Sequence, residues 1–259
     1  MKKYLISWGG GVNSTAIIAM IKLGMLPEYT KENSHIIMAD TGCEMPYTYE
    51  HTNIVLSAMA KEGWIAKVVS PYKQPELYSK RCVEKGLPEY CTSNEIIPSR
   101  INRWCTMEYK NKPIKEYRAK HNIDILVLGI ASEEKHRAKA LYAKDTDYPL
   151  IRLDVDRDKC IELIKEAGLP EARKSGCSFC PYQRKAQWIE LYREYPELFQ
   201  QAVEIENNAL NRYKRLGTKG YYLSRDIPIM KQVLKWLDVN CKQQTFDDFG
   251  LEQHCFCAD

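Results

Sequence analysis

Tyr4-Leu-Ile-Ser-Trp-Gly-Gly-Gly-Val-Asn-Ser-Thr-Ala-Ile-Ile-Ala-Met20 is the stretch that decides the fold. It begins with apolar residues typical of a strand, breaks at three consecutive glycines, and continues as an apolar run typical of a helix. Glycines let a backbone approach an anion and turn its N–H groups toward it. Asn13, Ser14 and Thr15 favour a helix N-terminus, and two of them add hydroxyl donors. Strand, glycine turn and helix together predict a phosphate-binding loop.

The loop fits neither of two common phosphate-binding motifs. A Walker A loop needs a lysine directly before the serine or threonine, and no lysine precedes Ser14. A dinucleotide fingerprint needs a third glycine where Ser14 stands. A glycine-rich turn that binds no ligand is the alternative interpretation of this stretch.

The composition is that of an ordinary soluble globular chain. Its 259 residues are 44% hydrophobic and 28% charged, enough for one full core or for a domain with a small appendage. The net charge of +4 permits an anionic substrate without demanding nucleic acid. No apolar run approaches the roughly 20 residues of a membrane-spanning helix, and the N-terminus lacks a signal-peptide pattern. We therefore expect a cytoplasmic protein without a membrane partner.

Polar residues follow two further predicted strands. Residues 34–39 form a buried-strand pattern that ends in Asp40-Thr41-Gly42, and residues 124–129 form another that ends at Gly129. Open α/β sheets bind ligands at this edge, although a polar turn that caps the next helix is the alternative. The following run, 130–137, ends in Arg137, which either clamps a phosphate or sulfate or pairs with Glu133 or Glu134.

Other segments complete the predicted pattern of elements. We expect helices over 47–63, 155–167 and 227–237, a helical run over 185–216, a strand over 64–69 and an extended segment over 148–153. Residues 70–101 show little periodicity and predict an insertion or active-site cover. The predicted domains are a nucleotide-binding domain over 1–170 and a helical C-terminal extension over 171–259.

The cysteine content is high for a chain without a signal peptide, which favours metal or redox chemistry over disulfides. Cys177 and Cys180 form a Cys-x-x-Cys pair that suits half a zinc site, half an iron–sulfur site or, less well, a thioredoxin-like redox pair. Cys105 lies in the basic stretch 100–120, where nearby cations predict a lowered thiol pKa. That stretch is otherwise the solvated face of a helix. The tail thiols could complete this site or be incidental, and Cys82 and Cys91, whose spacing fits no metal signature, are interpreted as ordinary thiols.

With these residues collected, the chain resembles the phosphoadenylyl-sulfate (PAPS) reductase family of the PP-loop, adenine-nucleotide α-hydrolase-like superfamily. Gly10, Gly11, Ser14 and Thr15 match the PP-loop pattern, whereas Gly9 replaces its serine and Asn13 its aspartate. Three other blocks carry the resemblance, which runs from Tyr4 to about Tyr182: Asp40-Thr41-Gly42 with Glu44 and Pro46, Arg103-Trp-Cys-Thr with Lys110, and Gly176-Cys-x-x-Cys-Pro.

The resemblance implies an α/β fold, a twisted and mostly parallel Rossmann-like sheet with flanking helices, followed by a helical cysteine-bearing part. It implies that ATP or PAPS lies at the strand ends, with Mg²⁺ as a further candidate. It also implies a 4Fe–4S cluster on Cys105, Cys177, Cys180 and a tail thiol, Cys257 or Cys255, with zinc as the alternative metal. The nucleotide-binding residues so implied are Ser7, Gly9, Gly10, Gly11, Asn13, Ser14, Thr15, Asp40, Thr41, Gly42, Arg103, Lys110 and Gly129.

Three functions remain open at this point. The first is ATP cleavage between the α- and β-phosphates followed by sulfur transfer to an acceptor, with nucleic acid as one candidate acceptor. The second is sulfonucleotide reduction with Cys255, Cys257 and Arg137 as catalytic residues, although the family's Glu-Cys-Gly-Leu-His terminus is missing. Both need a sulfur or electron donor protein. The third is a non-catalytic zinc-containing module that binds nucleic acid.

Overall fold

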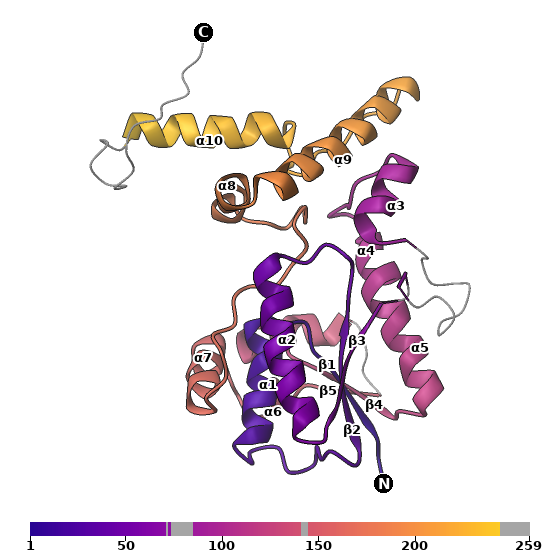
Figure 1. Ribbon diagram of the computed structural model, residues 1–259, viewed down its shortest axis with the longest axis vertical. Coiled ribbons are helices and arrows are strands. Elements are labelled where there is room, and N and C mark those ends of the chain that lie inside the picture. Colours follow the sequence, from indigo (N-terminus) through magenta and orange to yellow (C-terminus); the bar gives the residue numbers. More distant parts are fainter. Residues whose placement is uncertain (71, 74–84, 141–144, 244–259) are drawn as a thin grey trace. The chain divides into compact units, whose positions relative to one another are not determined.

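The structure, a computed structural model, describes residues 1–70, 72–73, 85–140 and 145–243. The chain divides into two compact units (Figure 1). The first consists of Met1–Ser93 and Ile101–Ser178. The second consists of Asn94–Arg100 and the chain from Phe179 onward. No helix in the described part of the chain is long and apolar enough to cross a membrane.

The first unit is built on a parallel sheet of five strands in the order β3-β2-β1-β4-β5. The central strand β1 pairs with β2 from Tyr4 opposite Ser34 to Ser7 opposite Ile37. On its other side, β1 pairs with β4 from Tyr4 opposite Ile125 to Ser7 opposite Leu128. The strands are β1 (Tyr4–Ser7), β2 (Ser34–Ala39), β3 (Ile65–Val69), β4 (Ile125–Leu128) and β5 (Thr146–Asp147). The predicted parallel α/β sheet with flanking helices is confirmed.

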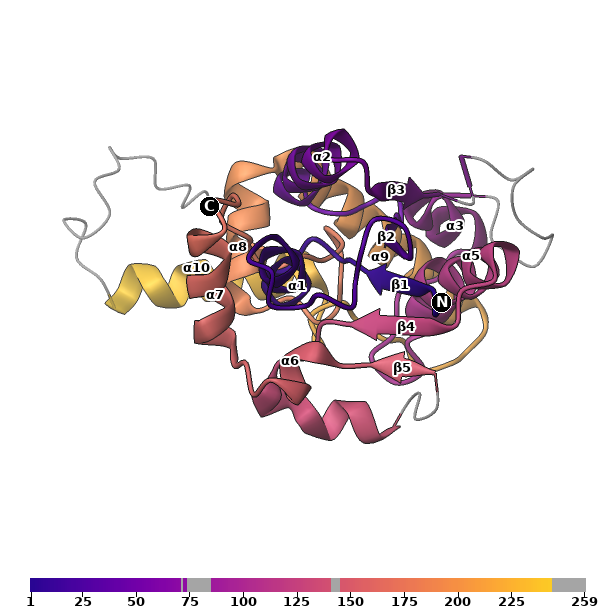
Figure 2. The same ribbon diagram turned by 90° about the horizontal axis from the view of Figure 1, so that it is seen from below.

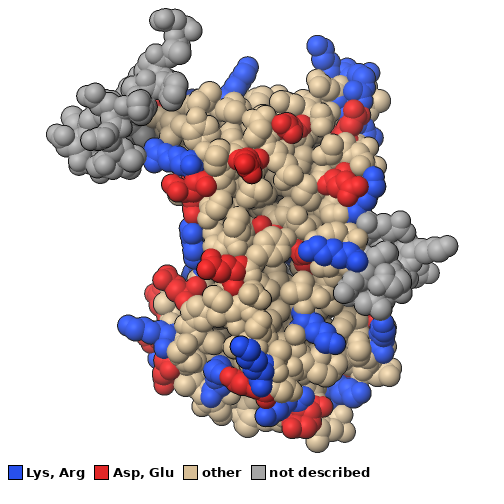
Figure 3. Space-filling model, in the orientation of Figure 1, with Lys and Arg blue, Asp and Glu red and all other residues tan. Residues whose placement is uncertain are grey.

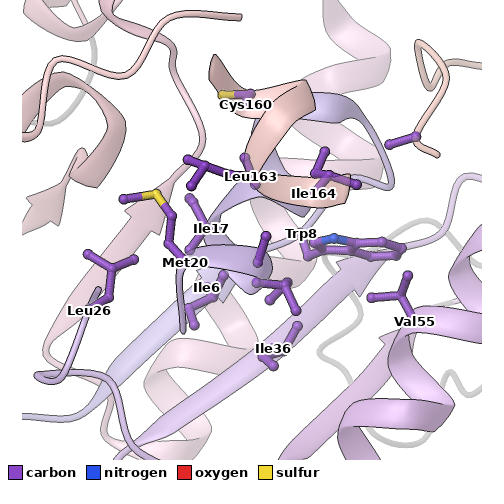
Figure 4. Packing of buried hydrophobic residues seen from close by; sticks show 14 of the residues in the cluster. Ile6, Trp8, Ile17, Met20, Leu26, Ile36, Val55, Cys160, Leu163 and Ile164 are labelled. Carbon is purple, nitrogen blue, oxygen red and sulfur yellow. The ribbon is translucent and has the colours of Figure 1, made fainter. Parts of the chain in front are cut away.

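Helices cover both faces of this sheet because alternate strand residues point to opposite sides. Ile6 and Ile36 pack with α1 (Val12–Lys22) and α7 (Arg157–Glu166), and Figure 4 shows this cluster close by. Leu5 and Ile37 belong to a second cluster with α5 (Lys112–His121). Figure 2 shows α1, α2 (Pro46–Lys61) and α7 on one side of the strands and α5 on the other.

The predicted boundaries of several elements agree with the structure. α2 ends shortly before Gly63, and α7 ends shortly before Gly168, both glycines having positive φ. The side chain of Asp156 accepts a hydrogen bond from the Lys159 amide and so caps the start of α7. The remaining elements of the first part of the chain are α3 (Leu87–Asn94), α4 (Trp104–Thr106), the π-helix η2 (Met107–Asn111) and the 3-10 helix η3 (Ser132–Ala140).

The prediction of an extended segment over 148–153 is wrong. Strand β5 ends at Asp147, and α6 (Pro149–Arg152) follows as a helical turn. Pro149 occupies the first turn of that helix, where its missing N–H has no intrahelical partner to lose. A proline that looked like a strand residue in the sequence is therefore a helix start.

The second unit is helical. The predicted run over 185–216 is two helices, α8 (Lys185–Glu194) and α9 (Pro196–Arg215), because Pro196 starts a new one, and α10 (Ile229–Gln243) follows. Trp188 and Phe199 are buried, as expected for packing residues. Glu206 is buried on α9, and its two carboxylate oxygens accept from the backbone amides of Leu223 and Ile229 at 2.7 and 2.6 Å.

Replacing Glu206 tests whether this carboxylate holds the turn before α10. A glutamine offers one acceptor oxygen for two backbone amides, so Glu206→Gln should lower the free energy of unfolding by about 1–3 kcal/mol. Urea denaturation followed by Trp188 fluorescence measures the change. Glu204→Gln, on the exposed side of the same helix, is the control and should change it by less than about 0.5 kcal/mol. Equal effects of the two variants would contradict this role.

Candidate functional site

The glycine loop links β1 to α1 at the carboxyl edge of the sheet. Gly11, rather than Asn13, is the N-cap of α1, so Asn13, Ser14 and Thr15 lie in its first turn. Ser14 Oγ accepts from the Gly9 amide at 3.2 Å and donates to the Gly11 carbonyl at 3.1 Å. Gly10 has a φ of +70°, a conformation that favours glycine. The strand order switches sides beside this loop, because β2 and β3 lie on one side of β1 and β4 and β5 lie on the other. Parallel α/β sheets bind ligands at such a switch point.

The loop is closely surrounded on three sides and open at one residue. A Cβ on Gly11 would lie 2.9 Å from Ser175 Oγ, and one on Gly10 would lie 3.1 Å from Thr48 Cγ2. A Cβ on Gly129, at the end of β4, would lie 2.8 Å from the Ser14 amide nitrogen. Gly9 has no described atom within 4 Å of its Cβ position. Among these glycines, Gly9 is thus the one with room for a side chain beside the described residues.

Several buried polar atoms beside the loop have no hydrogen-bond partner among the described residues. They are Trp8 Nε1, Asn13 Oδ1 and Thr48 Oγ1. Trp8 stacks on His51, whose Nε2 lies 3.2 Å from Thr15 Oγ1, and burial lowers the pKa of His51. Because buried polar groups normally have partners, these atoms mark a place suited to water or a polar ligand.

Arg137 is engaged with an acidic neighbour. It donates to Glu134 Oε1 at 2.7 Å, and Asn13 Nδ2 donates to Glu134 Oε2 at 3.2 Å. This is the ion pair that the sequence offered as the alternative to a phosphate clamp. The arrangement also brings a carboxylate beside Asn13, in the first turn of α1. The catalytic role of Arg137 stays a prediction.

Asp40 is a buried carboxylate surrounded by donors. It accepts hydrogen bonds from Tyr72 at 2.6 Å, Tyr49 at 2.7 Å and the Gly42 amide at 2.8 Å, and from Lys73 and Ser70 at longer range. Burial alone would raise the pKa of Asp40, but the hydrogen bonds outweigh it and lower the pKa. Gly42, with a φ of +82°, lets the backbone fold back onto this carboxylate. Asp40 therefore fixes the shape of the strand end.

A second buried carboxylate, Glu44, lies among thiols. Its Oε1 accepts from Lys110 at 3.0 Å and from Thr41 at 3.1 Å, and Cys177 Sγ lies 3.8 Å away. Its Oε2 is buried with no hydrogen-bond partner in the described part of the chain. Burial alone would lower the pKa of Lys110, but the charge of Glu44 outweighs it and holds that pKa above its usual value. Glu44 and Lys110 thus place a charged pair against the sulfur atoms.

Two thiols share one hydroxyl in this site. Thr41 Oγ1 lies 3.4 Å from Cys43 Sγ and 3.3 Å from Cys177 Sγ, and the two thiols hydrogen-bond each other. Glu44 and Cys177 form an isolated antiparallel bridge, which the Ser178 amide strengthens by donating to the Cys43 carbonyl at 2.7 Å. Burial and then Cys177 raise the pKa of Cys43 well above its usual value.

Cys105 and Cys91 lie near the same thiols. Both interact electrostatically with Cys177. The prediction that nearby cations lower the pKa of Cys105 is wrong, because burial and the neighbouring Cys177 raise it by more than Lys110 lowers it. Arg103 stands directly before α4 with a φ of +47°. The structure thus brings together Cys105, Cys177, Thr41 and Lys110 from the predicted set.

The remaining predicted ligands lie outside the described residues of the first unit. Cys180 belongs to the second unit, where its carbonyl accepts from the Gln183 amide at 3.0 Å. Cys255 and Cys257 lie outside the described residues. Among residues 1–70, 72–73, 85–140 and 145–243, no group of three or more His, Cys, Asp or Glu is arranged to hold a metal ion.

The basic stretch 100–120 has internal partners for several of its charges. Lys110 pairs with Glu44, Lys112 pairs with Glu108, and Arg118 donates to the Asp124 carbonyl. On the face seen in Figure 3, basic and acidic side chains are interspersed. This favours a structural interpretation of the stretch over a nucleic-acid surface.

Sequence reasoning missed Cys43 and Cys91 as members of the thiol group, and Ser175 and Thr48 as neighbours of the loop. Nothing in the spacing of these residues marks them, because each reaches the site through the fold. The sequence indicated Glu44 only through the family resemblance. Its position four residues after Asp40, at the end of a predicted buried strand, was the available signal.

No family model matches the sequence, and no curated protein matches it either. Among solved structures, the chain is similar to the U34-tRNA thiolase NcsA from Methanococcus maripaludis, solved with its 4Fe–4S cluster. The identity is 16% and the TM-score 0.45, over 83% of this chain and 72% of that chain.

Adding one methyl group at Gly129 tests how closely α1 packs against the end of β4. In Gly129→Ala the new Cβ meets the backbone of α1, so the free energy of unfolding should fall by about 1–3 kcal/mol. Urea denaturation measures the loss. Gly9→Ala is the matched control, because its Cβ meets nothing within 4 Å. A tolerated Gly129→Ala would show that α1 does not press on the end of β4.

The role of Asp40 predicts a pH-dependent effect of its replacement. Because the folded pKa of Asp40 is lowered, its stabilisation is present above the ordinary value of 3.8 and is lost as the pH falls through the folded pKa. Asp40→Asn should therefore cost about 1–3 kcal/mol at neutral pH. The difference from the unmutated protein should shrink below pH 3.8. Unfolding measured at several pH values checks this, and a difference that is constant with pH would contradict it.

Proposed function

We propose that the chain is an enzyme that binds an adenine nucleotide at the glycine loop and performs sulfur chemistry at the adjoining thiols. The observation that carries this proposal is the contact of Thr41 Oγ1 with Cys177 Sγ at 3.3 Å. Thr41 belongs to the polar segment that follows β2, one strand away from the glycine loop. One residue thus connects the strand edge suited to a nucleotide with the residues suited to sulfur chemistry.

The loop suits phosphate for reasons of geometry and charge. The first-turn amides of α1 point out of the helix N-terminus, where the helix dipole favours an anion. Gly9 leaves space beside those amides, and Thr48 and Asn13 offer buried polar atoms without partners in the described chain. Phosphate oxygens would accept hydrogen bonds from the first-turn amides and the Thr48 hydroxyl, whereas Asn13 Oδ1 is an acceptor and suits water or another donor. The adenosine would extend toward the segment that follows β2.

Two reactions suit a nucleotide bound in this way, and the structure favours one. Glu134 places a carboxylate next to Asn13, in the region where an acidic residue could help hold Mg²⁺ on ATP. This supports ATP cleavage between the α- and β-phosphates, with transfer of sulfur to an activated acceptor. Reduction of PAPS is the second candidate, and its proposed nucleophiles, Cys255 and Cys257, lie outside the described residues.

The predicted 4Fe–4S cluster, or zinc in its place, stays a proposal, because its four predicted ligands do not all lie in one described unit. Cys105 and Cys177 belong to the first unit and interact electrostatically, Cys180 belongs to the second unit, and Cys257 lies outside the described residues. We therefore derive no step of the reaction through a metal. The proposed partners are the nucleotide and a sulfur or electron donor protein, with nucleic acid as a candidate acceptor, and the proposed location is the cytoplasm.

Nucleotide binding is tested first. Ser14→Ala removes the hydroxyl that connects Gly9 to Gly11, so it should weaken ATP binding at least about 10-fold, the loss of roughly one hydrogen bond to a charged group. Isothermal titration calorimetry measures the affinity. Ser57→Ala, on the exposed face of α2, is the control and should leave the affinity unchanged. Absence of binding of both ATP and PAPS to the unmutated protein would overturn the proposal.

The products then separate the two reactions. Pyrophosphate released from ATP and Mg²⁺ in the presence of an acceptor supports sulfur transfer. Sulfite released from PAPS with a thiol reductant supports reduction instead, and would contradict our preference for ATP. Either product should disappear in Ser14→Ala and persist in Ser57→Ala.

A further inference from the structure

The thiol pair of Cys43 and Cys177 has a feature that the proposed function does not use. The two thiols hydrogen-bond each other and contact the same hydroxyl, that of Thr41. Residues 43 and 177 are distant in the sequence, but a backbone bridge between Glu44 and Cys177 holds the two segments together. The two sulfur atoms therefore share the Thr41 hydroxyl as a neighbour, on two segments that the Glu44–Cys177 bridge holds together.

The backbone around this pair is fixed on both sides. The Ser178 amide donates to the Cys43 carbonyl at 2.7 Å, and the Met45 amide donates to the Gly176 carbonyl at 3.1 Å. Disulfide formation requires close and correctly directed Cβ atoms, so a preformed bridge lowers the conformational cost of joining the two sulfurs. Cys160, on the buried face of α7, packs in the apolar core instead.

We propose that Cys43 and Cys177 are a redox-active dithiol that exchanges with external disulfides and forms a reversible Cys43–Cys177 bond. The substrate class is a low-molecular-weight or protein disulfide. The proposal concerns thiol exchange alone and does not depend on nucleotide binding.

The two thiols differ in access, which gives the exchange an order. Cys177 is partly exposed, whereas Cys43 is only 6% exposed. Cys177 therefore meets the external disulfide first: a mixed disulfide forms, the external S–S bond breaks, and one external thiol leaves. Glu44, 3.8 Å from Cys177 Sγ, is placed to accept the proton that this sulfur loses.

In the second step, Cys43 resolves the mixed disulfide. Cys43 attacks Cys177 Sγ, the Cys43–Cys177 bond forms, and the second external thiol leaves with the remaining proton. Two protein thiols are oxidised, and one external disulfide is reduced to two thiols. A sulfur held in this bond is no longer a nucleophile or a metal ligand, so oxidation would withdraw Cys177 from the site.

Disulfide mapping tests the proposal on the full chain. The fully reduced protein is treated with oxidised glutathione, alkylated, digested without reductant and analysed by mass spectrometry. We expect a peptide that joins Cys43 to Cys177 and a matching loss of alkylation at both residues. Reduction with dithiothreitol should restore both thiols.

Variants separate this pair from the other thiols. Cys43→Ser should abolish the linked peptide and leave Cys177 as a stable mixed disulfide with glutathione, detected by its added mass. Cys91→Ser, the matched control at another buried thiol of the same group, should leave the link intact. Circular dichroism verifies folding, and Cys43→Ala replaces Cys43→Ser if the hydroxyl is not tolerated.

The outcome that overturns the proposal is specific. A bond from Cys177 to Cys105 or Cys180 in place of Cys43, or an oxidised Cys177 beside a Cys43 that remains free, would contradict it. Calorimetry with ATP on the reduced protein tests the proposed function separately, so failure of one leaves the other standing.

Discussion

The structure depends on the close packing of α1 across the ends of β1 and β4. Most of α1 is buried, including both isoleucines and both alanines of its central turns, and such burial contributes on the order of 1.5–3 kcal/mol for each large side chain. The helix can sit this close only because Gly129 has no side chain to press on the first turn. The same packing leaves the first-turn amides at the carboxyl edge of the sheet. Core stability and the anion-binding geometry therefore have one cause.

A charge buried beside that edge must be stabilised by hydrogen bonds or an opposite charge, and the two carboxylates differ in which of these they have. Asp40 is surrounded by neutral hydroxyls and an amide, with one exposed lysine, so its negative charge is stabilised by hydrogen bonds. Glu44 relies on the ammonium group of Lys110 and keeps one oxygen without a partner in the described chain. A fully satisfied carboxylate organises a loop, whereas an incompletely satisfied one beside thiols is available for chemistry. The hydrogen bonds of Asp40 thus give it a structural role, whereas the reactivity of Glu44 is part of the proposal.

The sequence allowed the sheet to be predicted because apolar periodicity is local. β1, β2 and β4 are short apolar runs bounded by turn residues, and the helices α1, α2 and α7 end near Gly24, Gly63 and Gly168. α6 was missed because Pro149 is compatible with both an extended segment and a helix start. The pairing of Asn13 with Glu134, across 121 residues, could not be predicted, since only the β1–β4 neighbourhood brings them together.

The pairing of the thiols could not be predicted from the sequence either. Cysteine spacing indicated Cys177 and Cys180 as a pair, yet the structure joins Cys177 to Cys43, whose nearest cysteine in sequence is 39 residues away. The bridge at Glu44 makes this choice, because it brings the segment after β2 against the segment that carries Cys177. Glu44 and Thr41 then contact Cys177, and Lys110 pairs with Glu44: the carboxylate can accept a proton, whereas the ammonium and the hydroxyl can stabilise a thiolate. Backbone pairing rather than motif spacing thus determines which thiols can react together.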